Sequence, residues 1–367
     1  MPVHPRKRSW QGKALAALLL GGLLAGLVLW PYQGYAGQVV VLIDPGMSRR
    51  AIADELLARG VLYSRWPFLL YAYAQPHRTL KAGEYVFDRP LSAAGVFSKL
   101  VHGEVHLHPV TIPEGYTRWD IADEAARLGL ASREGFLKAT NNVELIRDLA
   151  PEATNLEGYL FPDTYYFARP ADPAAVVRTM VERFRRVNGQ LQETAANARQ
   201  LTPHQLVTLA SLVEKETGAA EERGLIAAVF YNRLERGVVL ACDPTVIYAA
   251  RLAEDGYFDG TINVSDLERK SPYNTYLHAG LPPGPIGSPG RAALEAVLNP
   301  PQSDYFYFVS NTHGGHLFAR TEREHERNVA RYRRLRVQQE RAARAAESRA
   351  EAATAPEPRR RKAARHP

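Results

Sequence analysis

The sequence predicts an α+β protein in which an N-terminal transmembrane helix precedes a small α/β region and a helix-rich domain. Three observations support this fold class. Residues 14–30 form an uninterrupted run of apolar residues and glycine. A strand–glycine turn–helix pattern occurs twice before residue 130, and helical patterns dominate after residue 170. With 367 residues, 46% of them hydrophobic, the chain can form two or three domains with substantial cores.

We divide the chain into five predicted segments. They are a basic cytoplasmic segment (1–13), a transmembrane anchor (14–31), an α/β region (38–130), a helix-rich domain (131–336) and a basic, disordered tail (337–367). The net charge of +7 is concentrated at the two ends, because residues 1–13 and 331–367 are strongly basic and the remainder is net acidic. A nucleic-acid-binding protein would carry its basic patch on the folded domain, so nucleic acid is not expected as a partner.

The apolar run has the flanks of a membrane anchor. Basic residues precede it without any acidic one, and Trp30, Tyr32 and Tyr35 follow it. The positive-inside rule and an aromatic belt therefore predict a single-pass protein of the inner membrane with its body in the periplasm. The alternative is a cleaved signal peptide, because Gly34-Tyr35-Ala36 has the small-x-small pattern of a cleavage site. We prefer the anchor because that site lies far beyond the apolar run.

The α/β region contains a repeat with an offset of 69 residues. Ile43, Gly46, Arg49, Ile52, Ala53, Asp54, Glu55 and Gly60 match Ile112, Gly115, Arg118, Ile121, Ala122, Asp123, Glu124 and Gly129. In each copy a strand and a glycine turn precede a helix that a glycine ends. This pattern resembles the opening of a LysM module, a fold that holds the N-acetylglucosamine units of glycan chains. We therefore predict a LysM-like glycan-binding region at 38–130, with a small spacer as the alternative.

The remaining elements are predicted from periodicity and breakers. Helices are expected at 48–59, 66–74, 120–128, 133–140, 143–149 and 172–195, with strands at 39–43 and 80–87 and an aromatic loop–strand segment at 156–167. From residue 337 the composition shifts to Arg, Ala, Glu and Pro. The first part of this tail can continue the preceding helix, and the prolines predict disorder beyond residue 353.

One predicted helix places a carboxylate on an apolar face. Thr202 and Pro203 form a favoured helix start, and the helix is expected to end near Thr217 and Gly218. Its apolar stripe consists of Leu206, Leu209, Leu212, Val213 and, in the same register, Glu216. Glu214 lies two residues earlier and therefore faces elsewhere.

A carboxyl group on an apolar face has a raised pKa, which a glycosidic general acid requires. The alternative is a buried ion pair between Glu216 and an arginine such as Arg223. Glu221 and Glu222 open the next helix, where the helix dipole favours acidic residues, so we interpret them as capping residues.

A series of motifs resembles the endolytic murein transglycosylases of the MltG (YceG-like) family. The motifs are Ala210–Thr217, Val229–Leu234, Asp243–Tyr248, Tyr273–Tyr276, Gly280–Gly284, Ser288–Gly290, Tyr305–Val309, Gly314–His316 with Phe318, and Leu156–Tyr165. With the N-terminal anchor, the resemblance extends to about Leu335. Cys242 departs from the family pattern, in which a polar residue is expected, and the basic tail is also unusual.

The resemblance implies one catalytic glutamate, Glu216, acting as acid and then as base. It implies cleavage of the MurNAc-GlcNAc bond within nascent strands, leaving 1,6-anhydro-MurNAc ends, and a LysM-like subdomain. The expected partners are glycan strands, the inner membrane and peptidoglycan synthases. The rival functions are a non-catalytic peptidoglycan-binding scaffold for synthases and a water-using muramidase, which would need a second carboxylate.

Seven further motif residues are predicted to bind substrate: Asn232, Asp243, Thr245, Tyr248, Tyr273, Asn274 and Tyr276. For two of them alternatives stay open. Asp243 could cap a helix, and Asn232 could orient Glu216 or satisfy backbone groups. The glycines and prolines at 280–290 predict a rigid loop that lines a groove. A metal site at His313, His316 and His325 is disfavoured, and neither metal nor cofactor is expected.

Overall fold

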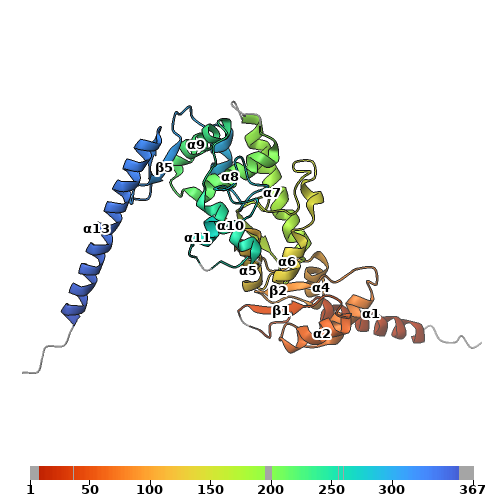
Figure 1. Ribbon diagram of the computed structural model, residues 1–367. Coiled ribbons are helices and arrows are strands. Elements are labelled where there is room, and N and C mark those ends of the chain that lie inside the picture. Colours follow the sequence, from red (N-terminus) through yellow and green to blue (C-terminus); the bar gives the residue numbers. More distant parts are fainter. Residues whose placement is uncertain (1–7, 36, 195–200, 255, 259, 355–367) are drawn as a thin grey trace, which may run out of the picture. The chain divides into compact units, whose positions relative to one another are not determined.

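The computed structural model describes residues 8–354, apart from residues 36, 195–200, 255 and 259 (Figure 1). The secondary structure of these described residues is mixed α and β, with many helices and three two-stranded antiparallel sheets. The chain divides into two compact units. The first comprises the residues up to Ile112, Trp119–Thr140 and Asp163–Thr179, and the second comprises Pro113–Arg118, Asn141–Pro162 and the residues from Met180 onward.

This division is more interleaved than the predicted boundary between residues 130 and 131. The reason is strand pairing, because β4 (Thr164–Phe167) lies antiparallel to β3 (His108–Thr111) and so returns the chain to the first unit. The last change from the first unit to the second, between Thr179 and Met180, falls within the long helix α7 (Pro173–Thr194). Pairing between strands more than fifty residues apart is not visible in local periodicity.

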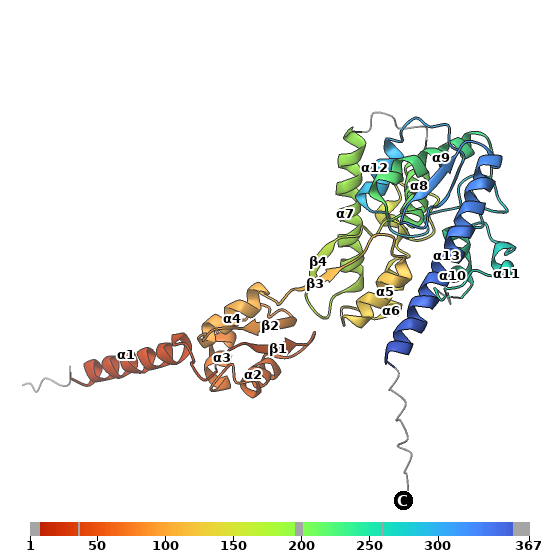
Figure 2. The ribbon, with the colours of Figure 1, turned by 90° about the vertical axis from the view of Figure 1, so that its left-hand side faces the viewer.

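The first unit contains a compact α/β core. Strand β1 (Val39–Ile43) pairs antiparallel with β2 (Gly83–Phe87). The helices α2 (Arg49–Ala58), α3 (Arg65–Tyr73) and α4 (Ala93–His102) gather beside this pair (Figure 2). The buried cluster between them includes Leu56, Phe68, Tyr85, Phe87 and Leu100, each at most 1% exposed.

The repeated unit forms in both copies. The second copy consists of β3 and α5 (Arg118–Arg127), and α6 (Arg133–Ala139) follows. Gly60 and Gly129 have φ angles of 76° and 65°. Both therefore have the left-handed conformation in which glycine ends a helix, as predicted.

The first helix, α1 (Arg8–Leu29), carries exposed leucines such as Leu18 and Leu23. Across the residues that the structure describes, none of the helices has both the length and the apolar character that crossing a membrane requires. The predicted transmembrane helix is therefore not confirmed, and residues 1–7 lie outside the described part.

The second unit is mostly helical. Its elements are η1 (Val143–Ile146), α8 (Pro203–Glu216), η2 (Ala220–Glu222), α9 (Arg223–Glu235), α10 (Asp243–Ala253), α11 (Val264–Leu267), α12 (Arg291–Leu298), the hairpin β5 (Tyr307–Ser310) and β6 (His316–Ala319), and α13 (Glu322–Thr354). Helix α8 packs against α9, α10 and α12. Helix α13 packs against the hairpin and continues through residue 337 to Thr354, so the first half of the predicted tail is helical. Residues 355–367 lie outside the described residues.

Candidate active site

Helix α8 has a capped start and a well-defined end. The Thr202 hydroxyl accepts a hydrogen bond from the Gln205 N–H at 3.2 Å, and the Gln205 side chain accepts one from the Thr202 N–H at 3.0 Å. This reciprocal capping box defines the start of the helix. At the other end Thr217 is extended, with φ −143° and ψ 137°, which makes Glu216 the last helical residue. The helix therefore stops one residue before the predicted end.

Glu216 is partly buried at this end of α8, beyond the fully buried stripe of Leu209, Leu212 and Val213. The Cys242 thiol donates a hydrogen bond to the Glu216 carboxylate. Burial raises the pKa of Glu216 above 4.5, and the charge of Asp243 raises it further. The Cys242 hydrogen bond and the nearby His316 and Arg233 lower this pKa, but burial has the largest effect.

The position of Glu216 on the helix acts in the same direction as burial. The carboxyl end of an α-helix carries a partial negative charge, which disfavours an ionised carboxylate there. The carboxyl group is thus held in an environment that favours its protonated form. This is the electrostatic requirement for a general acid near neutral pH.

Glu214 has a different environment, as its position on the helix predicts. Its carboxylate accepts the Gly290 N–H at 2.9 Å and lies 3.5 Å from the Arg223 guanidinium. The arginine considered as an ion-pair partner for Glu216 is therefore beside Glu214. Burial raises the pKa of Glu214 as well, although the Gly290 hydrogen bond opposes this.

The loop at 284–290 is held tightly against α8. The Ile286 N–H donates to the Ser211 hydroxyl at 3.0 Å. Ser288 exchanges backbone hydrogen bonds with Gly115 and Tyr116, both at 2.8 Å. At Gly287 a Cβ atom would lie 2.7 Å from the Gly115 carbonyl oxygen, so only glycine fits. Residues 284–290 are buried and held by these hydrogen bonds, whereas the rigidity of the loop at 280–290 and its place along a groove stay predictions.

A buried network of two threonines holds Cys242. The Cys242 N–H donates to the Thr275 hydroxyl at 3.0 Å, and the Thr245 hydroxyl donates to the Cys242 carbonyl at 2.7 Å. The two hydroxyls are 2.9 Å apart. Thr245 therefore supports Cys242, and through it the thiol beside Glu216.

Two of the predicted substrate-binding residues are exposed near Glu216. Asp243 accepts a hydrogen bond from the Tyr276 hydroxyl at 2.5 Å. Burial and this hydrogen bond raise the pKa of Tyr276, and the charge of Glu216 contributes in the same direction. Asp243 is the first residue of α10, and Cys242 occupies the N-cap position that we considered for Asp243. The structure thus brings Glu216, Asp243 and Tyr276 together.

The other predicted residues make hydrogen bonds within the fold. The Asn232 amide donates to the Ser303 and Tyr305 carbonyls, each at 2.8 Å, so it satisfies backbone groups. The Tyr248 hydroxyl donates to Glu157 at 3.1 Å.

Asn274 is fully buried and donates to the Leu267 and Arg269 carbonyls at 2.8 and 3.0 Å. The partly buried Tyr273 ring lies 4.9 Å from that of Tyr248, and burial raises the pKa of Tyr273 to about 12. Contact between these residues and a sugar stays a prediction.

Sequence reasoning missed two groups near Glu216. Arg233 donates to the Phe306 and Leu240 carbonyls, both at 2.6 Å, which ties α9 to β5 and to the chain before α10. His316 was named as a motif residue and as a disfavoured metal ligand, with no role beside Glu216. Its Nδ1 lies 2.7 Å from the Glu222 carboxylate, which also accepts the His316 N–H at 2.9 Å. Glu222 therefore anchors β6 and makes no side-chain cap. Arg233 lies in the last turn of α9, and its place within the motif Val229–Leu234 was the available signal for it.

His325 stacks on Tyr307 with ring centroids 5.1 Å apart. Within the described residues, His313, His316 and His325 do not form a group that could share a metal ion.

Comparisons with known proteins identify the family. The model of the YceG-like family matches residues 41–331. A protein of Bacillus subtilis named endolytic murein transglycosylase is 32% identical over 86% of this chain and 91% of its own length. A Streptococcus pneumoniae protein of the same name is 32% identical over 80% of this chain, which spans only 58% of that longer protein.

A crystal structure of a yceG-like protein from Listeria monocytogenes superposes with a TM-score of 0.51 at 31% identity, covering 80% of this chain and 99% of that one. Sequence and fold therefore agree, and the chain belongs to the YceG-like family.

Proposed function

We propose that this chain is an endolytic lytic transglycosylase that cleaves the MurNAc-GlcNAc bond within peptidoglycan strands, with Glu216 as acid and then base. The observation that carries the proposal is the Glu216 carboxyl, whose pKa burial raises at the end of an otherwise apolar stripe. The names of the Bacillus and Streptococcus relatives support the substrate class.

The chemistry needs one carboxyl group and no water. The Glu216 proton passes to the glycosidic oxygen as the C1–O bond breaks, and the departing sugar takes the bonding electron pair. The C6 hydroxyl of the MurNAc unit then attacks C1, and the Glu216 carboxylate accepts the hydroxyl proton. The carboxyl group is regenerated and the product has a 1,6-anhydro ring. An internal nucleophile has the entropic advantage of a tethered reactant.

Asp243 gives the muramidase alternative a specific candidate. Its charge acts on Glu216, and it is exposed, so it could activate a water molecule as a second carboxylate. We favour the lyase because the Asp243 carboxylate accepts the Tyr276 hydroxyl, which occupies one of its oxygens. The two mechanisms differ in their products, since hydrolysis leaves a reducing end.

The test is mass spectrometry of the products from purified glycan strands. Wild-type protein should give 1,6-anhydro ends, and Glu216→Gln should cut about 10²–10⁴-fold more slowly while still folding and binding glycan. Glu221→Gln is the matched control, because it makes the same substitution at an exposed position and should cut at the wild-type rate. Reducing ends would identify a hydrolase, and unchanged cleavage by Glu216→Gln would overturn the assignment of Glu216. Absence of cleavage by the wild type would leave the scaffold role.

We also propose that residues 14–31 anchor the chain in the inner membrane with its body in the periplasm. The basic residues before this segment and its exposed leucines support the proposal. A reporter fused after residue 337 should be active only in the periplasm. Cytoplasmic reporter activity would contradict this placement, whereas release of a soluble form would favour a cleaved signal peptide.

The repeated strand–turn–helix unit is proposed to contact glycan. Deletion of residues 38–130 should weaken binding to long strands and change product lengths if this region is LysM-like. Because the compact units interleave along the chain, the far-UV circular dichroism of the deletion variant must show that the remaining helices have folded. If a folded variant binds and cuts as the full chain does, the region is a spacer. Synthases that extend the same strands are the proposed protein partners.

A further inference from the structure

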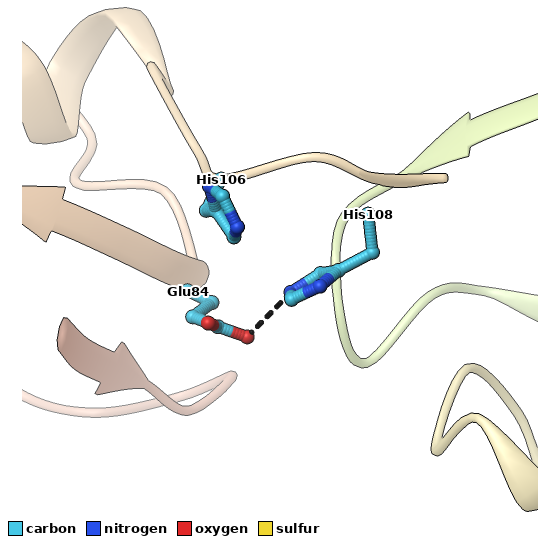
Figure 3. A group of neighbouring side chains, drawn as sticks. All are labelled: Glu84, His106 and His108. Carbon is cyan, nitrogen blue, oxygen red and sulfur yellow. Dashed lines mark hydrogen bonds and ion pairs between the residues drawn. The ribbon is translucent and has the colours of Figure 1, made fainter. Parts of the chain in front are cut away.

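Three side chains with metal-binding atoms converge in the first unit, and none of them is among the residues assigned above. They are Glu84 on β2, His106 on the connector after α4, and His108 at the start of β3 (Figure 3). One potential ligand atom from each lies within 4.8 Å of the other two. The His108 Nε2 atom is 2.9 Å from the Glu84 carboxylate, and the two imidazole rings are 4.5 Å apart at their centroids.

Backbone hydrogen bonds and strand pairing set the positions of these three residues. The His106 N–H donates to the Glu84 carbonyl at 2.6 Å, which holds the connector beside β2. His108 pairs with Phe167 in the β3–β4 ladder, and Glu84 pairs with Leu42 in the β1–β2 ladder. Glu84 and His108 thus lie on strands of two different sheets, and the backbone of His106 is hydrogen-bonded to the strand that carries Glu84. Little backbone rearrangement is needed to bring the three together.

We propose that Glu84, His106 and His108 bind a divalent zinc ion, with a fourth position open to water. Two imidazoles and one carboxylate are a ligand set that zinc uses when it keeps such a position. Imidazole ligands disfavour Mg²⁺ and Ca²⁺, which take oxygen ligands. Tetrahedral zinc with bonds of about 2.0–2.1 Å separates its ligand atoms by about 3.3 Å. The Glu84–His108 distance is already close to this value, and His106 is exposed, so its ring can swing inward.

Such an ion would act as a crosslink within the first unit. The ligands are separated by 24 residues between Glu84 and His108, so the ion would hold the connector after α4 and the start of β3 to β2. A ligand that binds only the folded state stabilises it by mass action. Zinc should therefore raise the melting temperature of the unit.

The test uses the untagged full chain, stripped of metal by a chelator and titrated calorimetrically with zinc. Wild type should bind one ion, and zinc should raise its melting temperature. His106→Ala removes an exposed side chain and should fold normally while binding zinc at least about tenfold more weakly, without the thermal shift. Glu84→Gln, which keeps the shape but loses the charge, should also weaken binding. His77→Ala is the control, because His77 is an exposed histidine outside the group.

Cobalt spectroscopy distinguishes zinc binding at this site from zinc binding to other histidines on the surface. Cobalt in place of zinc should give the visible absorption of a tetrahedral complex in wild type and in His77→Ala, but not in His106→Ala. Magnesium should give no heat of binding. The proposal is overturned if His106→Ala binds zinc as tightly as wild type, or if wild type binds no zinc.

Discussion

At the scale of single residues, Glu216 is distinguished by the mixture of groups around its carboxyl. The Cys242 thiol stabilises the ionised form, whereas burial and Asp243 destabilise it. The balance of these effects places the pKa above its ordinary value. Each neighbour therefore offers a way to move the pKa in a known direction, which tests the acid assignment more sharply than removal of the acid.

Cys242→Ala and Asp243→Asn should shift the pH profile of kcat/KM in opposite directions. The activity of a general acid falls as pH rises through its pKa. Loss of the thiol hydrogen bond raises the pKa of Glu216 and moves this decline to higher pH, whereas loss of the Asp243 charge lowers the pKa and moves it to lower pH. Cys242→Ser retains a donor and should restore the wild-type profile. Shifts in the same direction for both variants would contradict the assignment.

Glu216→Gln should stabilise the fold at neutral and alkaline pH. A folded-state pKa raised above 4.5 means that ionisation of Glu216 opposes folding, and this penalty grows as pH rises from about 4.5 through the raised pKa. Below that range the carboxyl is protonated in both states and the variants should melt alike. Thermal unfolding at several pH values measures the difference, at about 2–4 °C for each kcal/mol. Equal melting temperatures at pH 8 would show that Glu216 carries no such penalty.

At the scale of elements, the contact between the loop at 284–290 and the segment at 113–118 has no spare room. Gly287→Ala should destabilise the protein by about 1–3 kcal/mol, because the new methyl group meets a backbone carbonyl. Gly189→Ala is the matched control, since nothing lies within 4 Å of its Cβ position in α7. It should stabilise the helix by about 0.5–1 kcal/mol. Chemical denaturation measures both, and equal effects would contradict the packing argument.

Elements with a strong local pattern could be predicted from the sequence, and those fixed by distant contacts could not. The Thr202–Pro203 start and the apolar stripe were sufficient to predict α8 and the position of Glu216 on it. The environment of Glu216 was not predictable, because Cys242 and His316 come from other parts of the chain. The Glu222–His316 interaction joins residues 94 positions apart, and no periodicity indicates such a pair. Helix α4 was missed although Ser92 and Gly103 provide its caps.

At the scale of the whole molecule, the compact α/β core of the first unit should fold without the rest of the chain. Its buried cluster is drawn from residues 41–100, and the partly buried residues packed against it extend only from Tyr35 to Val105. A fragment of residues 34–105 should therefore fold alone, with a cooperative thermal transition and dispersed amide resonances. Leu56→Ala in this fragment should cost about 2–5 kcal/mol, because Leu56 is fully buried. A fragment without a cooperative transition would show that this core depends on the rest of the chain.

That self-contained core has a consequence for the order of events during synthesis. All of its residues precede residue 106, whereas Glu216 lies 111 residues after residue 105. At about 5–20 residues per second, the ribosome needs on the order of 6–22 s to make the intervening stretch. The compact α/β core of the first unit can therefore fold before the ribosome has synthesised α8. Substitutions around Glu216 should then leave this early folding step unchanged.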